Sequence, residues 1–137
     1  MDIKALNRSV IDDFRANGGK VSGPMAGAPL LLLTTKGAKS GQTRVNPLAY
    51  TMDGARYVII ASYAGSPNNP PWYHNLLANP TVTVEVGNEK FQADAKVVDE
   101  PNRTKFYRQM ASQMSVFNEY EKKTTRKIPV IALTRRR

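Results

Sequence analysis

The alternation of apolar and polar residues along the chain predicts a mainly β protein with six short strands. Residues 81–86 and 91–98 alternate strictly, and Gly87-Asn88 between them is typical of a hairpin turn. A continuous apolar run at residues 29–35 predicts a buried strand. Further strands are expected at residues 44–52, 56–62 and 128–134.

Apolar residues at helical spacing predict helices at other places in the chain. Pro70-Pro71 suits the first turn of a short helix over residues 72–78. Asp99-Glu100 before Pro101 favours the start of a longer helix, since carboxylates are stabilised near the positive end of a helix dipole. A helix over residues 2–17, ended by Gly18-Gly19, would carry an apolar stripe of Ile3, Leu6, Val10, Ile11 and Phe14.

The order of these elements favours an antiparallel β-barrel with helices on its outside. Asp53-Gly54 between two apolar runs is a strong hairpin signal, and we expect the first three strands to form an antiparallel meander. At about 150 residues per domain, a chain of 137 residues predicts one compact domain. We divide it into an N-terminal amphipathic helix, residues 1–20, and a barrel, residues 21–137.

The apolar stripe of the N-terminal helix leaves its partner open: the chain's own barrel, a second subunit or a lipid surface. No apolar run approaches the roughly 20 residues of a membrane span, and the first residues lack the pattern of a secretory leader. We therefore expect a cytoplasmic protein, with peripheral membrane contact left open. The oligomeric state is left open as well.

Two residue types central to much enzyme chemistry are scarce in this chain. The absence of cysteine excludes disulfide scaffolds, thiol catalysis and thiolate metal sites. A single histidine, His74, excludes histidine-cluster metal centres and most histidine-based triads. We therefore expect no bound metal.

The formal net charge of +9 favours anionic partners, although most of the excess lies in residues 101–137. A smaller, acid-free cluster of Lys36, Lys39 and Arg44 flanks the turn between the first two strands. Its two glycines let the main chain approach a ligand, and Ser40 and the turn N–H groups can donate hydrogen bonds to phosphate or carboxylate. The turn lacks Walker-loop spacing, and a solvated basic turn is the alternative.

Residues 69–80 form a second constellation, Asn-Pro-Pro-Trp-Tyr-His-Asn-Leu-Leu-Ala-Asn-Pro. Leu76 and Leu77 suit a core face, against which Trp72 and Tyr73 would pack. His74 is expected to be a partly exposed helix residue without a catalytic role, because no serine nucleophile or second metal ligand has suitable spacing.

These separated motifs resemble, in order, those of the deazaflavin-dependent nitroreductase family of actinobacteria. The matching segments are residues 32–48, Asp53-Gly54, residues 59–62, residues 69–80 and Arg126-x-Ile128-Pro129-Val130, within a resemblance over about residues 28–134. The resemblance implies a split β-barrel like that of FMN-binding flavin reductases. It also implies coenzyme F-420, a 5-deazaflavin with a phospholactyl oligoglutamate tail, as the cofactor.

Each motif acquires an expected place around this cofactor from the resemblance. The turn residues Ala38, Lys39 and Ser40, followed by Arg44, would hold the phosphate and the start of the anionic tail. The residues that would line or bracket the ring system, through main-chain amides and through Trp72 and Asn75, are Val45, Asn46, Pro47, Leu48, Ala49, Ile60, Ala61, Ser62, Tyr63, Pro71, Trp72, Tyr73, His74 and Asn75.

The implied reaction is hydride transfer from reduced coenzyme F-420 to a quinone or similar electrophilic acceptor, with nitroaromatics as further candidates. Ser62 and Tyr120 are the expected catalytic residues, which would orient the acceptor or stabilise negative charge on its oxygen. Phe117 and Tyr120 are expected at the substrate side. Because Phe117 stands where relatives carry a tyrosine, we expect quinone reduction to exceed nitroimidazole reduction.

Two other functions stay open at this point. One is an FMN-dependent flavin reductase or oxidase on the same barrel, which relative binding of deazaflavin and FMN would separate. The other is a basic nucleic-acid-binding barrel, favoured by the net charge. The strands show no regular run of exposed aromatic residues for base stacking, which counts against nucleic acid.

Overall fold

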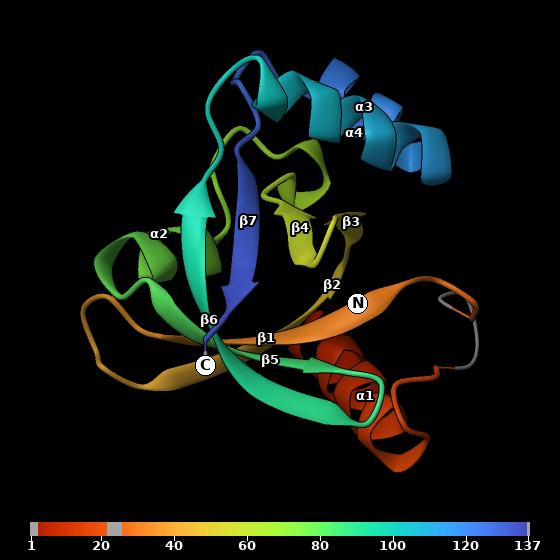
Figure 1. The fold of residues 1–137 in the computed structure, drawn as a ribbon, viewed down its shortest axis with the longest axis vertical. Helices are drawn as coiled ribbons and strands as arrows, with labels where there is room; N and C mark the ends of the chain where they lie inside the picture. Colours follow the sequence, from red (N-terminus) through yellow and green to blue (C-terminus); the bar gives the residue numbers. More distant parts are fainter. Residues whose placement is uncertain (1–2, 22–25, 137) are drawn as a thin grey trace.

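The computed structural model describes residues 3–21 and 26–136, with side chains from Asn7 onward. Its strands form one antiparallel sheet in the order β2-β1-β5-β6-β7-β4-β3. Figure 1 shows this sheet strongly curled, with helices around it. The strands are β1 (Leu30–Lys36), β2 (Thr43–Ala49), β3 (Thr51–Asp53), β4 (Arg56–Ile60), β5 (Thr81–Val86), β6 (Glu89–Val97) and β7 (Val130–Arg135).

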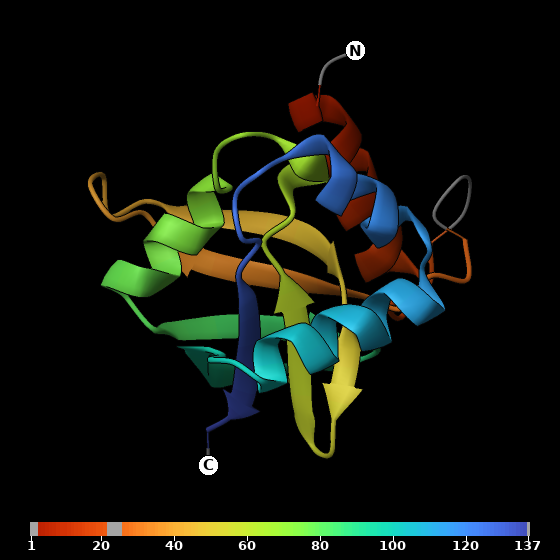
Figure 2. The same ribbon diagram turned by 90° about the horizontal axis from the view of Figure 1, so that it is seen from above.

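The helices lie on different sides of the curled sheet (Figures 1 and 2). α3 and α4 cover one end, α1 packs at the opposite end, and α2 lies apart from both groups. Their bounds are α1 (Ile3–Ala16), α2 (Pro71–Ala78), α3 (Asn102–Gln113) and α4 (Val116–Lys123), with a single 3-10 turn, η2 (Tyr63–Gly65), among the described residues. The predicted mainly β barrel with flanking helices is confirmed.

One predicted strand is wrong in its extent, because the segment 44–52 breaks at Tyr50 into β2 and β3. β2 pairs with β1, whereas β3 pairs with β4, and β1 and β4 are not neighbours in the sheet. The predicted antiparallel meander therefore holds in its order of pairing, but its middle strand is divided between the two edges of the sheet. Since β2 and β3 are the two edge strands and are joined through one residue, the sheet must curl until its edges approach each other.

The predicted hairpin after β3 is confirmed, with its turn one residue later than expected. Asp53 pairs with Arg56 across the ladder and forms an ion pair with it, so Gly54 and Ala55 make the two-residue loop. Gly54 has a φ of +58°, in the left-handed region that such hairpin loops require.

The continuous apolar run at the start of β1 is explained by burial on both faces of the strand. Leu31 and Leu33 belong to the main barrel core, whereas Leu30 and Leu32 pack against Phe14 of α1. All four leucines are at most 4% exposed. Because successive residues of a strand point to opposite faces, this strand needs apolar residues at every position.

The packing of Phe14 gives α1 a partner within its own chain. Val10 and Ile11 lie beside Phe14 in the same cluster, so the predicted stripe faces the barrel at these positions. The side chains of Ile3 and Leu6, also placed on the stripe, lie outside the described residues. None of the helices described here is long and apolar enough to cross a membrane.

Candidate functional site

An open cavity of about 670 Å³ lies between α1, β2 and α2. Trp72, Val45 and Ile11 give it apolar walls, and three arginines lie around them. This size and this mixture of surfaces suit a ring system that carries an anionic group. The lining residues are Asn7, Arg8, Ile11, Asp12 and Arg15 of α1, Thr43, Arg44, Val45 and Asn46 of β2, and Pro71, Trp72 and Asn75 of α2.

Asn75 ties the α2 wall of the cavity to the basic turn after β1. Its Oδ1 accepts a hydrogen bond from the Ala38 N–H at 3.1 Å, and its Nδ2 donates to Thr35 Oγ1 at 3.2 Å. Both Asn75 and Thr35 are buried. A satisfied, buried amide of this kind fixes the position of the elements that it joins.

The basic turn itself is tightly closed by its own main chain. The Gly37 N–H donates to Gln42 O at 2.7 Å, and the Gly41 N–H donates to Gly37 O at 3.1 Å. A Cβ built on Gly37 would lie 2.6 Å from Ser40 Oγ, so a larger residue would displace that hydroxyl. The turn can therefore present its groups to a ligand in one conformation.

The cations of this turn have no acidic partner within the described part of the chain. The Arg44 guanidinium donates only to neutral oxygens, Gln42 Oε1 at 3.1 Å and Thr43 O at 3.3 Å. Lys39 is exposed and forms no ion pair with a described residue. Unneutralised cations beside a cavity favour an anionic ligand.

β2 presents a free main-chain edge, because it is the last strand on its side of the sheet. In an antiparallel pair of strands, opposite residues alternate between pairs that are hydrogen-bonded to each other and pairs that are not. Because Gly37 is hydrogen-bonded to Gln42, the opposite residues Thr35 and Arg44 form a bonded pair and Thr34 and Val45 a non-bonded pair. The N–H and C=O of Val45 therefore point away from β1. Pro47 has the same phase as Val45, so its missing N–H costs no ladder bond.

Arg126 holds together the loop that follows β4. Its guanidinium donates to Ser62 O at 2.6 Å, Ser66 O at 2.9 Å, Ala61 O at 3.1 Å and Asn69 Oδ1 at 2.7 Å. All of these acceptors are neutral, and desolvation lowers the pKa of Arg126. Arg126 thus fixes a loop through its charge without an ion pair among the residues that the structure describes.

The loop held by Arg126 contains two residues in an unusual conformation. Tyr63 and Ala64 have φ values of 49° and 54°, in the left-handed region that non-glycine residues rarely adopt. A Cβ on the following Gly65 would lie 2.8 Å from both Tyr120 O and Lys123 Cβ of α4. The loop is therefore pressed against α4, and such strain persists only where the surroundings hold it.

The predicted site residues of this loop differ in which of their hydrogen-bonding groups remain available to a ligand. Ile60 and Ala61 are buried in the core, and both main-chain groups of Ala61 are hydrogen-bonded, to Pro129 O and to Arg126. Ser62 is 8% exposed, and its hydroxyl caps neither the η2 turn nor any other described group by a hydrogen bond. Ser62 and the exposed Tyr63 are thus the predicted residues of this loop whose side-chain hydroxyls form no hydrogen bond with a described residue.

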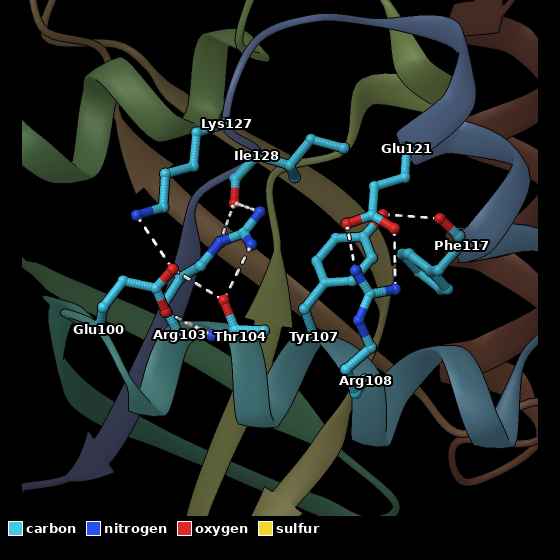
Figure 3. A network of polar contacts seen from close by, with 9 residues as sticks. All are labelled: Glu100, Arg103, Thr104, Tyr107, Arg108, Phe117, Glu121, Lys127 and Ile128. Carbon is cyan, nitrogen blue, oxygen red and sulfur yellow. Dashed lines mark hydrogen bonds and ion pairs between the residues drawn. The ribbon is translucent and has the colours of Figure 1, made fainter.

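Phe117 and Tyr120 lie on α4 and do not line the cavity between α1, β2 and α2. Phe117 is 6% exposed and packs edge-on against Tyr120, with ring centroids 5.4 Å apart. Figure 3 shows Phe117 beside Tyr107, whose hydroxyl donates to Phe117 O at 2.6 Å. Burial raises the pKa of Tyr107 to about 12, so this hydroxyl remains a donor at neutral pH. The direct role of Phe117 is to support Tyr120, which is half-buried.

The structure brings together six of the predicted cofactor residues at one cavity, from two elements far apart in the sequence. Among the others, Tyr73 is half-buried, and His74 is exposed on α2, where a partly exposed helix residue was expected. No group of three or more potential metal ligands occurs among residues 3–21 and 26–136. The six at the cavity are Arg44, Val45, Asn46, Pro71, Trp72 and Asn75.

The family model described as F420H(2)-dependent quinone reductase matches residues 6–135. The chain belongs to this family. An F420H(2)-dependent quinone reductase of Mycobacterium tuberculosis is 41% identical over 128 residues, covering 90% of this chain and 85% of the relative. A second relative from the same species, described as a putative F420H(2)-dependent quinone reductase, is 33% identical over 105 residues, covering 77% of this chain and 88% of the relative.

Solved structures agree with this family assignment. The structure of an F420-H2 dependent reductase superposes with a TM-score of 0.70 at 36% identity, covering 77% of this chain and 93% of that chain. A haem storage protein from Vibrio cholerae superposes with a TM-score of 0.62 at 17% identity, covering 93% of this chain and 88% of that chain, which shows likeness of fold alone. The predicted split-barrel class is thereby confirmed.

Membership of this family implies coenzyme F-420, and the residues at the cavity fit that molecule. The unneutralised Arg44 suits its anionic part, the indole of Trp72 suits its planar ring, and the free edge of β2 offers main-chain hydrogen bonds. Sequence reasoning missed two contributors, Arg126 as the loop anchor and the polar face of α1 as a cavity wall. The amphipathic spacing of α1 was visible, but which surface its polar face would meet was not.

Proposed function

We propose that this chain transfers a hydride from reduced coenzyme F-420 to a quinone or similar electrophilic acceptor. The observation that carries the proposal is one cavity that combines an unneutralised guanidinium, a free strand edge and an aromatic wall, in a chain of this family. When bound, coenzyme F-420 supplies the hydride from C5 of its reduced ring. The protein must then supply position, a dry surface and charge complementarity.

The basic turn and β2 bind and orient the cofactor in this proposal. Arg44 and Lys39 hold the phosphate and the start of the anionic tail, because neither has an acidic partner among the described residues. The outward N–H and C=O of Val45 match a ring edge that carries both carbonyl and N–H groups. Trp72, 5% exposed, gives the ring a water-excluding surface.

Ser62 and Tyr120 act on the acceptor in this proposal. The Ser62 hydroxyl, which forms no hydrogen bond with a described residue, donates one to the acceptor oxygen on which negative charge develops. Tyr120, held by Phe117 on the helix against which the Ser62 loop packs, positions the acceptor. Arg126 keeps the Ser62 loop in place by binding the Ser62 carbonyl.

Stopped-flow oxidation of the reduced cofactor by menadione tests the proposal. We expect the wild-type protein to catalyse oxidation of the reduced cofactor by menadione. Tyr120→Ala should lower the turnover at least tenfold and leave the Kd of the cofactor within a few-fold of the wild-type value, because positioning of the acceptor acts on the transition state. Lys122→Ala, an exposed change on the same helix, is the control and should keep wild-type turnover.

Three outcomes would contradict parts of this account. If the wild-type protein turned over neither menadione nor a bicyclic nitroimidazole, the proposed reaction would be refuted. Faster turnover of the nitroimidazole than of menadione would refute the acceptor ranking. Wild-type turnover by Tyr120→Ala would remove Tyr120 from the site.

A further inference from the structure

The second half of α1 is anchored firmly to the barrel. Phe14, 2% exposed, packs with Leu30 and Leu32 of β1. Arg15 donates two parallel hydrogen bonds to the Glu85 carboxylate of β5, from Nε to Oε1 at 3.0 Å and from Nη2 to Oε2 at 2.8 Å. This fork leaves the Glu85 side chain only 12% exposed. One apolar contact and one bidentate ion pair thus hold the helix against two adjacent strands.

The end of α1 fits closely onto the turn of the β5–β6 hairpin. Gly18 and Gly19 both have positive φ values, +62° and +90°. A Cβ on Gly19 would lie 2.6 Å from Gly87 Cα, and one on Gly18 would lie 2.7 Å from Asn88 Oδ1. Since the main chains touch here, the direction of α1 across the barrel is fixed from this end.

The face that α1 turns toward the cavity carries Arg8, a cation that is in no ion pair within the described part of the chain. Glu85 and then Asp12 raise the pKa of Arg15. Arg15 is ion-paired with Glu85, and Asp12 is the one acid among the residues that line the cavity. Arg8, one helical turn from Asp12, forms no ion pair with any residue that the structure describes. Across the cavity, Arg44 of β2 is unneutralised as well.

We propose that Arg8 is a second anion contact of the cofactor site, so that α1 closes one side of the cavity around the anionic part of coenzyme F-420. Two guanidinium groups from separate elements line one cavity, neither forms an ion pair with a described residue, and Asp12 is the single acid in the lining. An anion bound between the two guanidinium groups would therefore be stabilised by both. The assignment of the ligand rests on the proposed function. α1 is then a wall of the binding site in addition to a packing element.

Two substitutions at the cavity and one control away from it test this role. Arg8→Gln and Arg44→Gln each remove one charge at the cavity and keep a hydrogen-bonding side chain. Lys96→Gln removes one charge from an exposed position of β6 that forms no ion pair with a described residue. The probes are coenzyme F-420 and a deazaflavin analogue that ends at the ribityl group, titrated by fluorescence against folded protein verified by circular dichroism.

We expect Arg8→Gln to weaken the binding of coenzyme F-420 by about five- to tenfold, the effect of losing a charge-assisted hydrogen bond from an exposed arginine. The ribityl analogue should bind Arg8→Gln and wild-type protein within twofold of each other, and Lys96→Gln should change neither Kd by more than twofold. A loss that is equal for both probes would overturn the assignment, because it would mean displacement of α1 alone.

The failure of this inference is distinguishable from failure of the proposed function. If Arg44→Gln weakens cofactor binding and Arg8→Gln stays within twofold of wild type, the Arg8 contact is wrong and the cofactor site stands. If wild-type protein does not bind coenzyme F-420, the proposed function fails and the Arg8 contact with it.

Discussion

Replacement of Arg126 by alanine tests how the site loop is held. The guanidinium donates to four neutral oxygens, three of them main-chain carbonyls of residues 61–66. A hydrogen bond to a charged group contributes about 1.5–3 kcal/mol, but some of these half-buried acceptors regain water when the side chain is removed. We therefore expect Arg126→Ala to lower the free energy of unfolding by about 2–4 kcal/mol, well below the sum of the individual bonds.

Chemical denaturation and hydrogen exchange measure this effect globally and locally. For a chain of this size a loss of 2–4 kcal/mol corresponds to a fall in Tm of roughly 6–14 °C. Arg126→Lys keeps the charge but offers one donor centre, so an intermediate loss is expected. Amides of the loop over residues 61–69 should exchange faster in both variants. Lys96→Ala is the control, because Lys96 is exposed on β6 and forms no ion pair with a described residue, so its loss should cost less than about 0.5 kcal/mol.

The role assigned to Arg126 has a clear contrary result. If Arg126→Ala is destabilised by no more than Lys96→Ala, the four contacts do not hold the loop. If stability falls while exchange of the loop amides is unchanged, Arg126 supports the core and not the site.

Three further changes probe other parts of the structure. Gly19→Ala should destabilise the fold by roughly 1–3 kcal/mol in urea melts, since its Cβ would lie 2.6 Å from Gly87 Cα at a positive φ, and an unchanged melt would refute that close approach. Phe117→Ala should cost about 3–5 kcal/mol, as for a buried core aromatic, and a loss below 1 kcal/mol would mean that Phe117 is not packed in the core. Hydrogen bonds from the Thr104 hydroxyl, from Lys127 and from the Thr104 N–H lower the pKa of Glu100 to about 2 (Figure 3). This carboxylate therefore stabilises the fold above its ordinary pKa of 4.5 and loses that contribution as the pH falls toward 2. The stability of Glu100→Gln should accordingly fall less than that of the wild-type protein over this pH range. An equal fall in both proteins would contradict the lowered pKa.

Much of the fold follows from local patterns in the sequence. The strict alternation of β5 and β6, the Pro-Pro start of α2 and the apolar run of β1 each have one physical interpretation, and the structure confirms them. The break at Tyr50 was not predictable in this way, because residues 43–53 carry no glycine that marks it. It follows from closure of the sheet, which depends on the pairing of strands distant in sequence.

The candidate site was predictable where one motif supplied it. The charges and glycines of the basic turn are enough to predict an anion-binding segment. Trp72 and Asn75 likewise mark the α2 motif as a candidate wall of the site. Arg126 was visible as part of a motif, but three of its four acceptors are main-chain carbonyls, which no residue type reveals. The α1 wall depends on where a helix docks, and that is set by the Arg15–Glu85 pair across 70 residues.

Comparison of cofactor affinities tests the central claim most directly. Purified protein titrated with coenzyme F-420 and with FMN under the same conditions gives two Kd values by fluorescence. The acid-free basic turn and the cavity cations predict tighter binding of coenzyme F-420, because its oligoglutamate tail carries negative charges that FMN lacks. Binding of FMN tenfold tighter than coenzyme F-420, a difference of about 1.4 kcal/mol, would contradict the account and favour an FMN enzyme on the same barrel.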